Sequence, residues 1–389
     1  MALDPRVATA AYIDSIGADA LAKSAAYTSG NHWLLLWGLL VTIAVAWLII
    51  RTGVLERIDA RMAKRGFNAR AFLVSLVYFV LAGILSLPWA MYRGWFRETS
   101  YGRSSQPFGD ALLQNVLGIA ISALLGGLFF MGVYALIRRT GKRWWLWSGA
   151  LAIGGISAVL LVAPVVIEPL FNEYKPLPEG QVRSALTGMA EAAGIPADRI
   201  FVYDGSRQSN NFTANVSGIG PYARIAISDI ALKGASLDEV RAVTAHEIGH
   251  YTLRHVWRSV VLLSLIVMIA LFVAGRSYGW VAVRMGSRAP LASPTGLPVV
   301  MVMVSFLFLL ALPLVNAFTR IGETEADRHS LETAQLPDAL ASALVKTAEY
   351  RYPRPNAVQE FLFYSHPSVE RRVRMAMDWK AANAAGPAQ

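Results

Sequence analysis

Six long apolar runs constrain the fold of this chain more than any other feature of its sequence. Each is about 17–24 residues long and contains no Asp, Glu, Lys or Arg, and polar breaks separate one run from the next. A helix needs about 20 mainly apolar residues to cross the hydrocarbon core of a bilayer. The sequence therefore predicts a mainly α-helical, multi-pass integral membrane protein whose spans cover 33–50, 71–92, 116–137, 144–167, 259–275 and 297–318.

Composition excludes several other classes of protein. Charged residues make up 16% of the chain, against about 25% in an average soluble domain. The chain has no cysteine, which excludes a disulfide scaffold, a cysteine nucleophile and a thiolate metal site. Its net charge of +10 is not gathered in one basic tract, so the sequence favours a lipid bilayer as partner and not nucleic acid.

The spans divide the chain into four parts. Residues 1–167 form an N-terminal membrane domain with four spans, 168–258 face water, 259–318 hold two further spans, and 319–389 face water again. Two spans separate the water-facing parts, so both emerge on the same face of the membrane. We expect insertion into a cell inner membrane or its equivalent without a cleaved signal peptide, because 1–30 lack a basic stretch beside an apolar core. Charge leaves the orientation open, because Lys and Arg near the span ends are close to evenly shared between the two sides.

The water-facing parts have a mixed α+β pattern. Helical periodicity covers 181–193, and short apolar runs at 200–203 and 224–228 indicate strands. Ser236 and Glu239 have the spacing of a capping box, which predicts a helix from Leu237. Nothing in the sequence stops that helix firmly before Gly275, so we expect it to run on into the fifth span. Further helices are predicted at 319–334, 338–350 and 368–381.

The capped helix carries the sequence His246-Glu247-Ile248-Gly249-His250. Two histidines four residues apart lie on one helix face, so their imidazoles can share one metal ion. Glu247, next to the first histidine, can take a proton from the attacking water. This is the pattern of zinc peptidases. The alternative is a pair of helix-surface histidines with an incidental glutamate.

A zinc peptidase needs a third protein ligand, and Glu323, just past the last apolar run, is a candidate. Asp327 lies four residues later on the same predicted helix face, where its carboxylate could accept the second ring N–H of a ligand histidine. Glu325 should point elsewhere. The alternative reading is a solvated acidic helix start.

Three more residues could take part. His366 could stabilise the oxyanion of a tetrahedral intermediate, and Arg371 and Arg372 could bind a substrate carbonyl or carboxylate. The alternative is that His366 is only a histidine that precedes a helix start, and that Arg371 and Arg372 are ordinary surface residues. His255, five residues after His250 and off its helix face, is interpreted as structural.

Three short motifs follow one another in order along the chain. They are His246-Glu247-x-x-His250, Glu323-x-x-x-Asp327 and His366-Pro367. In this combination they resemble the type I CAAX prenyl endopeptidases, integral-membrane zinc metallopeptidases of the gluzincin group. The resemblance extends over most of the chain. It implies a barrel of about six transmembrane helices around a large chamber, capped by a small α+β zinc peptidase domain.

The resemblance also implies site roles. One zinc ion would be held by His246, His250 and Glu323, with Glu247 as the base and His366 assisting the transition state. Substrate backbone would pair with a strand edge around 223–228, and Asn215 is the nearest match to a substrate-holding asparagine. Arg371 and Arg372 both remain matches to the family arginine. The zinc domain, made of 168–258 and 319–389, would lie in the cytoplasm.

The expected reaction is hydrolysis of a peptide bond in a peptide or protein substrate, with lipidated and membrane-bound proteins among the candidates. Trimming of the C-terminus of lipidated proteins is implied by the resemblance alone, and membrane-protein quality control is an open alternative. Two further rivals are an intramembrane site-2-type protease, which would carry its histidine motif within an apolar run, and a carrier or scaffold with a relict metal site.

Overall fold

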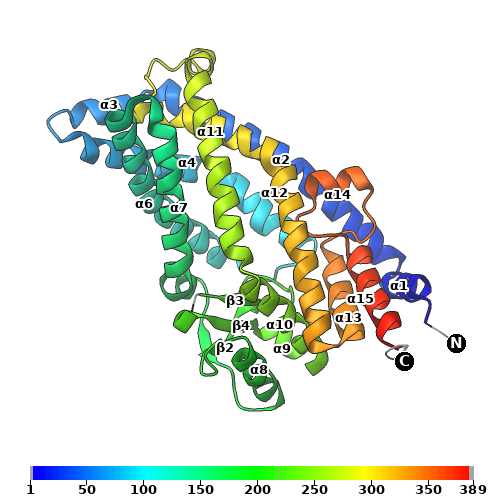
Figure 1. The fold of residues 1–389 in the computed structure, drawn as a ribbon. Helices are drawn as coiled ribbons and strands as arrows, with labels where there is room; N and C mark the ends of the chain where they lie inside the picture. The colour runs from blue at the N-terminus through cyan, green and yellow to red at the C-terminus, as the bar shows by residue number, and fades with distance from the viewer. Residues whose placement is uncertain (1–2, 219, 385–389) are drawn as a thin grey trace.

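The computed structural model describes residues 3–218 and 220–384, and it is dominated by long helices that run from a small sheet-containing end to the opposite end of the molecule (Figure 1). The long helices are α2 (Ala18–Thr52), α4 (Phe67–Met91), α6 (Phe108–Thr140), α7 (Trp144–Val162), α11 (His255–Met285) and α12 (Leu297–Ala334). Four of the six predicted spans lie wholly within such helices, and the spans 71–92 and 144–167 continue past α4 and α7 into the π-helical segments Tyr92–Phe96 and Ala163–Ile167. Five helical stretches of the described chain are long and apolar enough to cross a membrane, and one of them, Phe108–Leu170, contains both α6 and α7.

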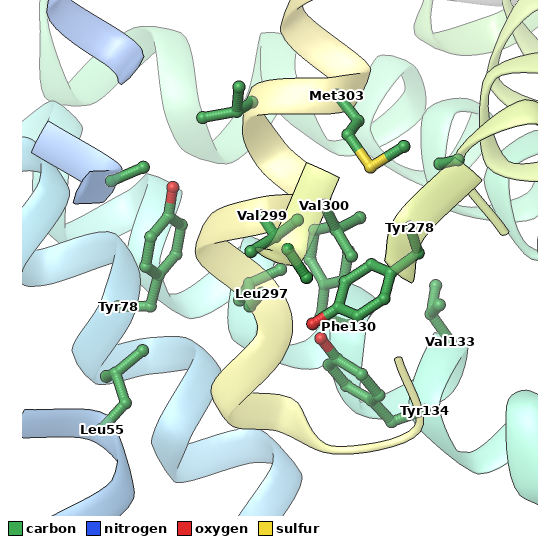
Figure 2. Packing of buried hydrophobic residues seen from close by; sticks show 14 of the residues in the cluster. Leu55, Tyr78, Phe130, Val133, Tyr134, Tyr278, Leu297, Val299, Val300 and Met303 are labelled. Carbon is green, nitrogen blue, oxygen red and sulfur yellow. The ribbon is translucent and has the colours of Figure 1, made fainter. Parts of the chain in front are cut away.

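The membrane helices share one apolar core. Figure 2 shows part of this core, where Tyr78, Phe130 and Tyr278 pack around Val299 and Val300 of α12. The helix α4 packs along α6, and Gly126 of α6 allows the contact, because a Cβ atom there would overlap the ring of Phe79.

Beside this core is a cavity of about 530 Å³. Its lining includes the polar side chains of Thr42, Ser86, Gln114, Asn115, Ser122 and Ser305. These residues come from α2, α4, α6 and α12, so the helices form an open cavity with polar side chains in part of its lining.

The first water-facing part contains a four-stranded sheet in the order β1-β2-β4-β3. The strands are β1 (Tyr174–Pro176), β2 (Ile200–Tyr203), β3 (Ala214–Ser217) and β4 (Arg224–Ser228). The strand β4 pairs in parallel with β2 and antiparallel with β3, so both of its edges are occupied. The expectation of a free strand edge at 223–228 is therefore wrong, and the free edge on that side of the sheet belongs to β3.

Three helices accompany this sheet, α8 (Gln181–Ala192), α9 (Asp229–Gly234) and α10 (Leu237–Thr252). The helix α10 starts where its capping box predicts. The prediction that it runs on into the fifth span is wrong, because the chain breaks after Thr252 and α11 begins at His255. Arg254, at the break, has φ 58° and ψ 35°, a left-handed conformation that ends one helix and redirects the next.

The second water-facing part begins on α12, which continues past its apolar stretch without interruption to Ala334. It continues with α13 (Pro337–Lys346), α14 (Ala357–Phe363) and α15 (Val369–Ala384). The N-terminal helix α1 (Pro5–Asp14) packs against α15, and Ile13 is buried in a cluster with Leu331 and Val373 (Figure 1). Segments that touch one another outside the membrane must lie on the same side of it. This contact therefore requires an even number of spans between α1 and these helices.

The remaining helices are two short segments beside the spans. They are α3 (Val54–Arg61) and α5 (Arg97–Ser100).

Candidate metal centre

The helix α10 is fixed at its N-terminus by its capping box. The backbone N–H of Ser236 donates to Glu239 Oε2 at 2.8 Å, and the N–H of Glu239 donates to Ser236 Oγ at 3.2 Å. Glu239 also accepts hydrogen bonds from Ser342 Oγ and Lys346 Nζ of α13, both at 2.7 Å. The start of α10 is thereby tied to the second water-facing part, two turns before the histidine motif.

Three side chains from α10 and α12 converge on one point. One ligand atom from each of His246, His250 and Glu323 lies within 4.8 Å of the other two. The two histidine Nε2 atoms are 3.1 Å apart, and each is 3.4 Å from a Glu323 oxygen. Gly249 permits this approach of the helices, because a Cβ atom there would lie 3.0 Å from His329 Cβ and 3.2 Å from Ala326 Cα.

These three residues fit a zinc ion. The outer nitrogens of both rings face other side chains, since His246 Nδ1 lies 2.9 Å from Asp327 and His250 Nδ1 lies 2.8 Å from His255. The Nε2 lone pairs are therefore free to point inward, and Glu323 Oε2 is buried without a hydrogen-bond partner among the described residues. Two imidazoles and one carboxylate, with a fourth position left for water, form a typical zinc donor set in peptidases.

The charge at this point also favours a cation. Burial by itself lowers the pKa of His246, but the carboxylates of Asp327 and Glu323 outweigh burial and raise that pKa. The carboxylates around His246 thus stabilise positive charge at the place where a metal ion would sit.

Asp327 and Arg372 form a buried pair behind His246. Asp327 is 1% exposed, and Arg372 donates to its two oxygens at 2.7 and 2.6 Å. Burial lowers the pKa of Arg372, but the charge of Asp327 more than compensates and raises it. Arg372 therefore stays charged, holds Asp327 ionised and leaves that carboxylate to accept the N–H of His246.

A cavity of about 220 Å³ opens on the metal centre. Glu247 and His366 both line it, and His366 Nε2 lies 3.2 Å from Glu323 Oε1. Burial raises the pKa of Glu247. Burial and the charge of Arg351 lower the pKa of His366 to about 3, so its imidazole is neutral near pH 7.

The candidate substrate residues separate in the structure. Arg372 lines the cavity, whereas the Arg371 side chain is 69% exposed and donates to Glu360 Oε1 at 2.9 Å. Asn215 lies on β3 opposite Ala226, and its Oδ1 is buried without a partner among the described residues, but the cavity is lined by its neighbours Phe212, Thr213 and Ala214. Its predicted role in holding substrate stays a prediction.

Two residues at the centre were not predicted. His255 contacts His250, and Glu325 contacts His255 Nε2 at 2.8 Å. Glu325 does point away from the metal ligands, as expected, but toward a residue that touches one of them. The only hint in the sequence is the occurrence of His255 and Glu325 close to the two ligand motifs.

Comparisons with known proteins agree with this geometry. Residues 176–380 match the family described as peptidase family M48, and residues 5–173 match the CAAX prenyl protease N-terminal region of five membrane helices. A Bacillus subtilis protein described as the uncharacterized metalloprotease YhfN is 26% identical, over 92% of this chain and 85% of its own length. The CAAX prenyl protease 1 homolog of Oryza sativa is 27% identical, over 80% of this chain and 76% of its own length.

A solved structure has the same fold. The crystal structure of S. mikatae Ste24p superposes with a TM-score of 0.75, covering 94% of this chain and 90% of that chain at 20% sequence identity. This likeness places the six long helices and the sheet-containing end in one known arrangement, that of a helical chamber with a peptidase domain at one end.

Proposed function

This chain belongs to peptidase family M48, and we propose that His246, His250 and Glu323 hold the zinc ion while Glu247 is the general base. The protein is a membrane-embedded zinc metalloendopeptidase that resembles the CAAX prenyl proteases. The observation that carries the assignment is the convergence of two Nε2 atoms on the buried carboxylate of Glu323, whose Oε2 has no hydrogen-bond partner among the described residues. Glu247 lines the cavity that opens at the same point.

The chain's own residues supply the proton transfers. Zinc, when bound, supplies a Lewis acid that polarises the scissile carbonyl and makes a water molecule more acidic. Glu247 takes the proton from that water and later gives it to the leaving amine. Burial raises the pKa of Glu247, which helps the carboxyl group to keep the proton between the two steps.

His366 acts in this proposal as a neutral hydrogen-bond donor. Ser365 Oγ lies 2.9 Å from His366 Nδ1 and can donate to it, which leaves the proton of the imidazole on Nε2, the nitrogen that lies 3.2 Å from Glu323 Oε1. A neutral donor at that position stabilises the negative charge that develops on the carbonyl oxygen. Arg372 acts further back, through Asp327, on the orientation of His246.

We further propose that the substrates are lipidated or membrane-bound proteins cleaved near their C-terminus. Relatives in rice, yeast and human are named CAAX prenyl proteases, and the open cavity among the spans gives space next to the lipid. The test compares two peptides of one sequence, with and without a prenyl group on cysteine. Mass spectrometry of the products should show faster cleavage of the prenylated peptide by the wild type and none by Glu247→Gln. Equal cleavage rates for the two peptides would refute the proposed preference for prenylated substrates.

The zinc domain, made of 168–258 and 319–389, is proposed to face the cytoplasm. The absence of cysteine allows a direct test with single introduced cysteines. Lys233 is an exposed residue of the sheet-containing end, and Lys64 is exposed in the loop between α3 and α4 at the opposite end of the spans. In intact cells an impermeant thiol reagent should label Lys64→Cys and not Lys233→Cys. The opposite pattern would place the domain outside.

A further inference from the structure

We propose that His255 and Glu325 are positioning residues that orient His250 for binding the metal, an inference that rests on the proposed role of His250 as a ligand. Nothing in the motif spacing assigns a role to either residue. The structure places them in an unbroken line behind His250, with Nδ1 of His250 2.8 Å from Nδ1 of His255, and Nε2 of His255 2.8 Å from Glu325 Oε2. Arg258 Nη1 completes the line at 2.6 Å from the same oxygen.

The direction of each hydrogen bond in this line follows from its two ends. A guanidinium group only donates and an ionised carboxylate only accepts, so neutral His255 must donate its Nε2 proton to Glu325. His255 Nδ1 then carries a lone pair, and His250 must donate its own Nδ1 proton to it. The Nε2 atom of His250 is left with a lone pair directed at Glu323 and His246. The line therefore selects the tautomer of His250 that can bind a metal.

The two ligand histidines thus have equivalent support. His246 donates to Asp327, which is held by Arg372, and His250 donates through His255 to Glu325, which is held by Arg258. The difference is that the imidazole of His255 lies between His250 and its carboxylate, Glu325, whereas His246 contacts Asp327 directly. A direct carboxylate partner for His250 would have to lie where the His255 ring lies.

The backbone around His255 is adapted to place this ring. In an uninterrupted helix, a residue five positions after His250 would point about 140° away from it. The left-handed conformation at Arg254, which is unfavourable for a residue other than glycine, turns His255 back instead. On the other side of the ring is Gly322, where a Cβ atom would lie 3.4 Å from His255 Nδ1 and 3.5 Å from Cγ. The His255 side chain is 9% exposed as a result.

The experiment measures zinc affinity, not activity. Metal-free wild type, His255→Ala and Glu325→Gln are titrated with zinc against a chromogenic chelator, and Glu332→Gln serves as the matched control because Glu332 is an exposed carboxylate on the same helix. Loss of a residue behind a ligand typically weakens metal binding about 10–100-fold. We expect a loss in that range for His255→Ala and Glu325→Gln, and none for Glu332→Gln.

A double variant separates positioning from general damage. If the two residues act through one line, His255→Ala/Glu325→Gln should bind zinc no more weakly than His255→Ala alone. The melting temperature of the metal-free Glu325→Gln protein should match that of wild type, and the visible spectrum of its cobalt-loaded form should change. Zinc affinities within about twofold of wild type for both single variants would overturn the inference.

His250→Ala distinguishes this failure from failure of the ligand assignment. If His250→Ala greatly weakens zinc binding while the His255 and Glu325 variants do not, only the positioning role is wrong. If His250→Ala leaves zinc affinity unchanged, the proposed ligand set is itself wrong.

Discussion

At the scale of single residues, the centre contains two glutamates whose loss should have different effects. Glu247→Gln keeps the size of the side chain and leaves all three proposed ligands in place, so the variant should bind zinc normally and be almost inactive. Glu323→Gln removes the anionic oxygen that lacks another partner in the described structure, so it should lose zinc affinity as well as activity. Zinc content and peptide cleavage measured on both variants check the assignment. Normal zinc binding by Glu323→Gln would contradict it.

The adjacent residues Arg371 and Arg372 provide a matched pair for stability. Arg372→Ala leaves Asp327 buried without its cation, and breaking a buried ion pair in this way typically costs about 3–5 kcal/mol. Arg371→Ala removes an ion pair in which the Arg371 side chain is 69% exposed, so solvent screens it and its loss should cost less than that of the buried pair. Thermal unfolding should therefore occur at a much lower temperature for Arg372→Ala. Similar melting temperatures for the two variants would refute the structural role given to Arg372.

At the scale of secondary-structure elements, the metal centre depends on the close approach of α10 and α12. Gly249→Ala would place a methyl group 3.0–3.2 Å from His329 and Ala326, so α10 would have to move by a few tenths of an ångström. We expect weaker zinc binding and a lower melting temperature, although alanine favours helix.

Gly188→Ala is the control for this substitution. Gly188 also lies within a helix, α8, and a Cβ atom there meets nothing within 4 Å. The change should stabilise the protein by up to about 1 kcal/mol through helix propensity and leave zinc affinity unaltered. If Gly249→Ala behaved in the same way, the contact between α10 and α12 would not limit the site.

The start of α10 and the face that carries its two histidines were predictable, because a capping box and a four-residue spacing are local properties of the sequence. Its end was not predictable, because Leu253 and Arg254 are residues that helices accept, and the turn places His255 against Gly322 of a distant helix. The role of β3 as the edge strand and the burial of Arg372 but not of Arg371 likewise depend on contacts between distant segments, which residue spacing does not encode.

At the scale of the whole molecule, zinc would connect two water-facing parts that are separated along the chain by two spans. A ligand that binds only the folded protein stabilises it by about 4 kcal/mol at a free concentration a thousand times its dissociation constant. Removal of zinc with a chelator should therefore lower the melting temperature, and added zinc should restore it. The variant His246→Ala/His250→Ala should show no such shift, and a shift of wild-type size in that variant would mean that the stabilising zinc binds elsewhere.

The packing of α15 has a consequence for how the metal centre is assembled. This helix contacts α1 and also brings Arg372 behind His246. The support of the first ligand histidine is therefore complete only when a segment that follows all six spans in the chain has packed against one that precedes them. Insertion of the spans by itself does not complete the metal centre.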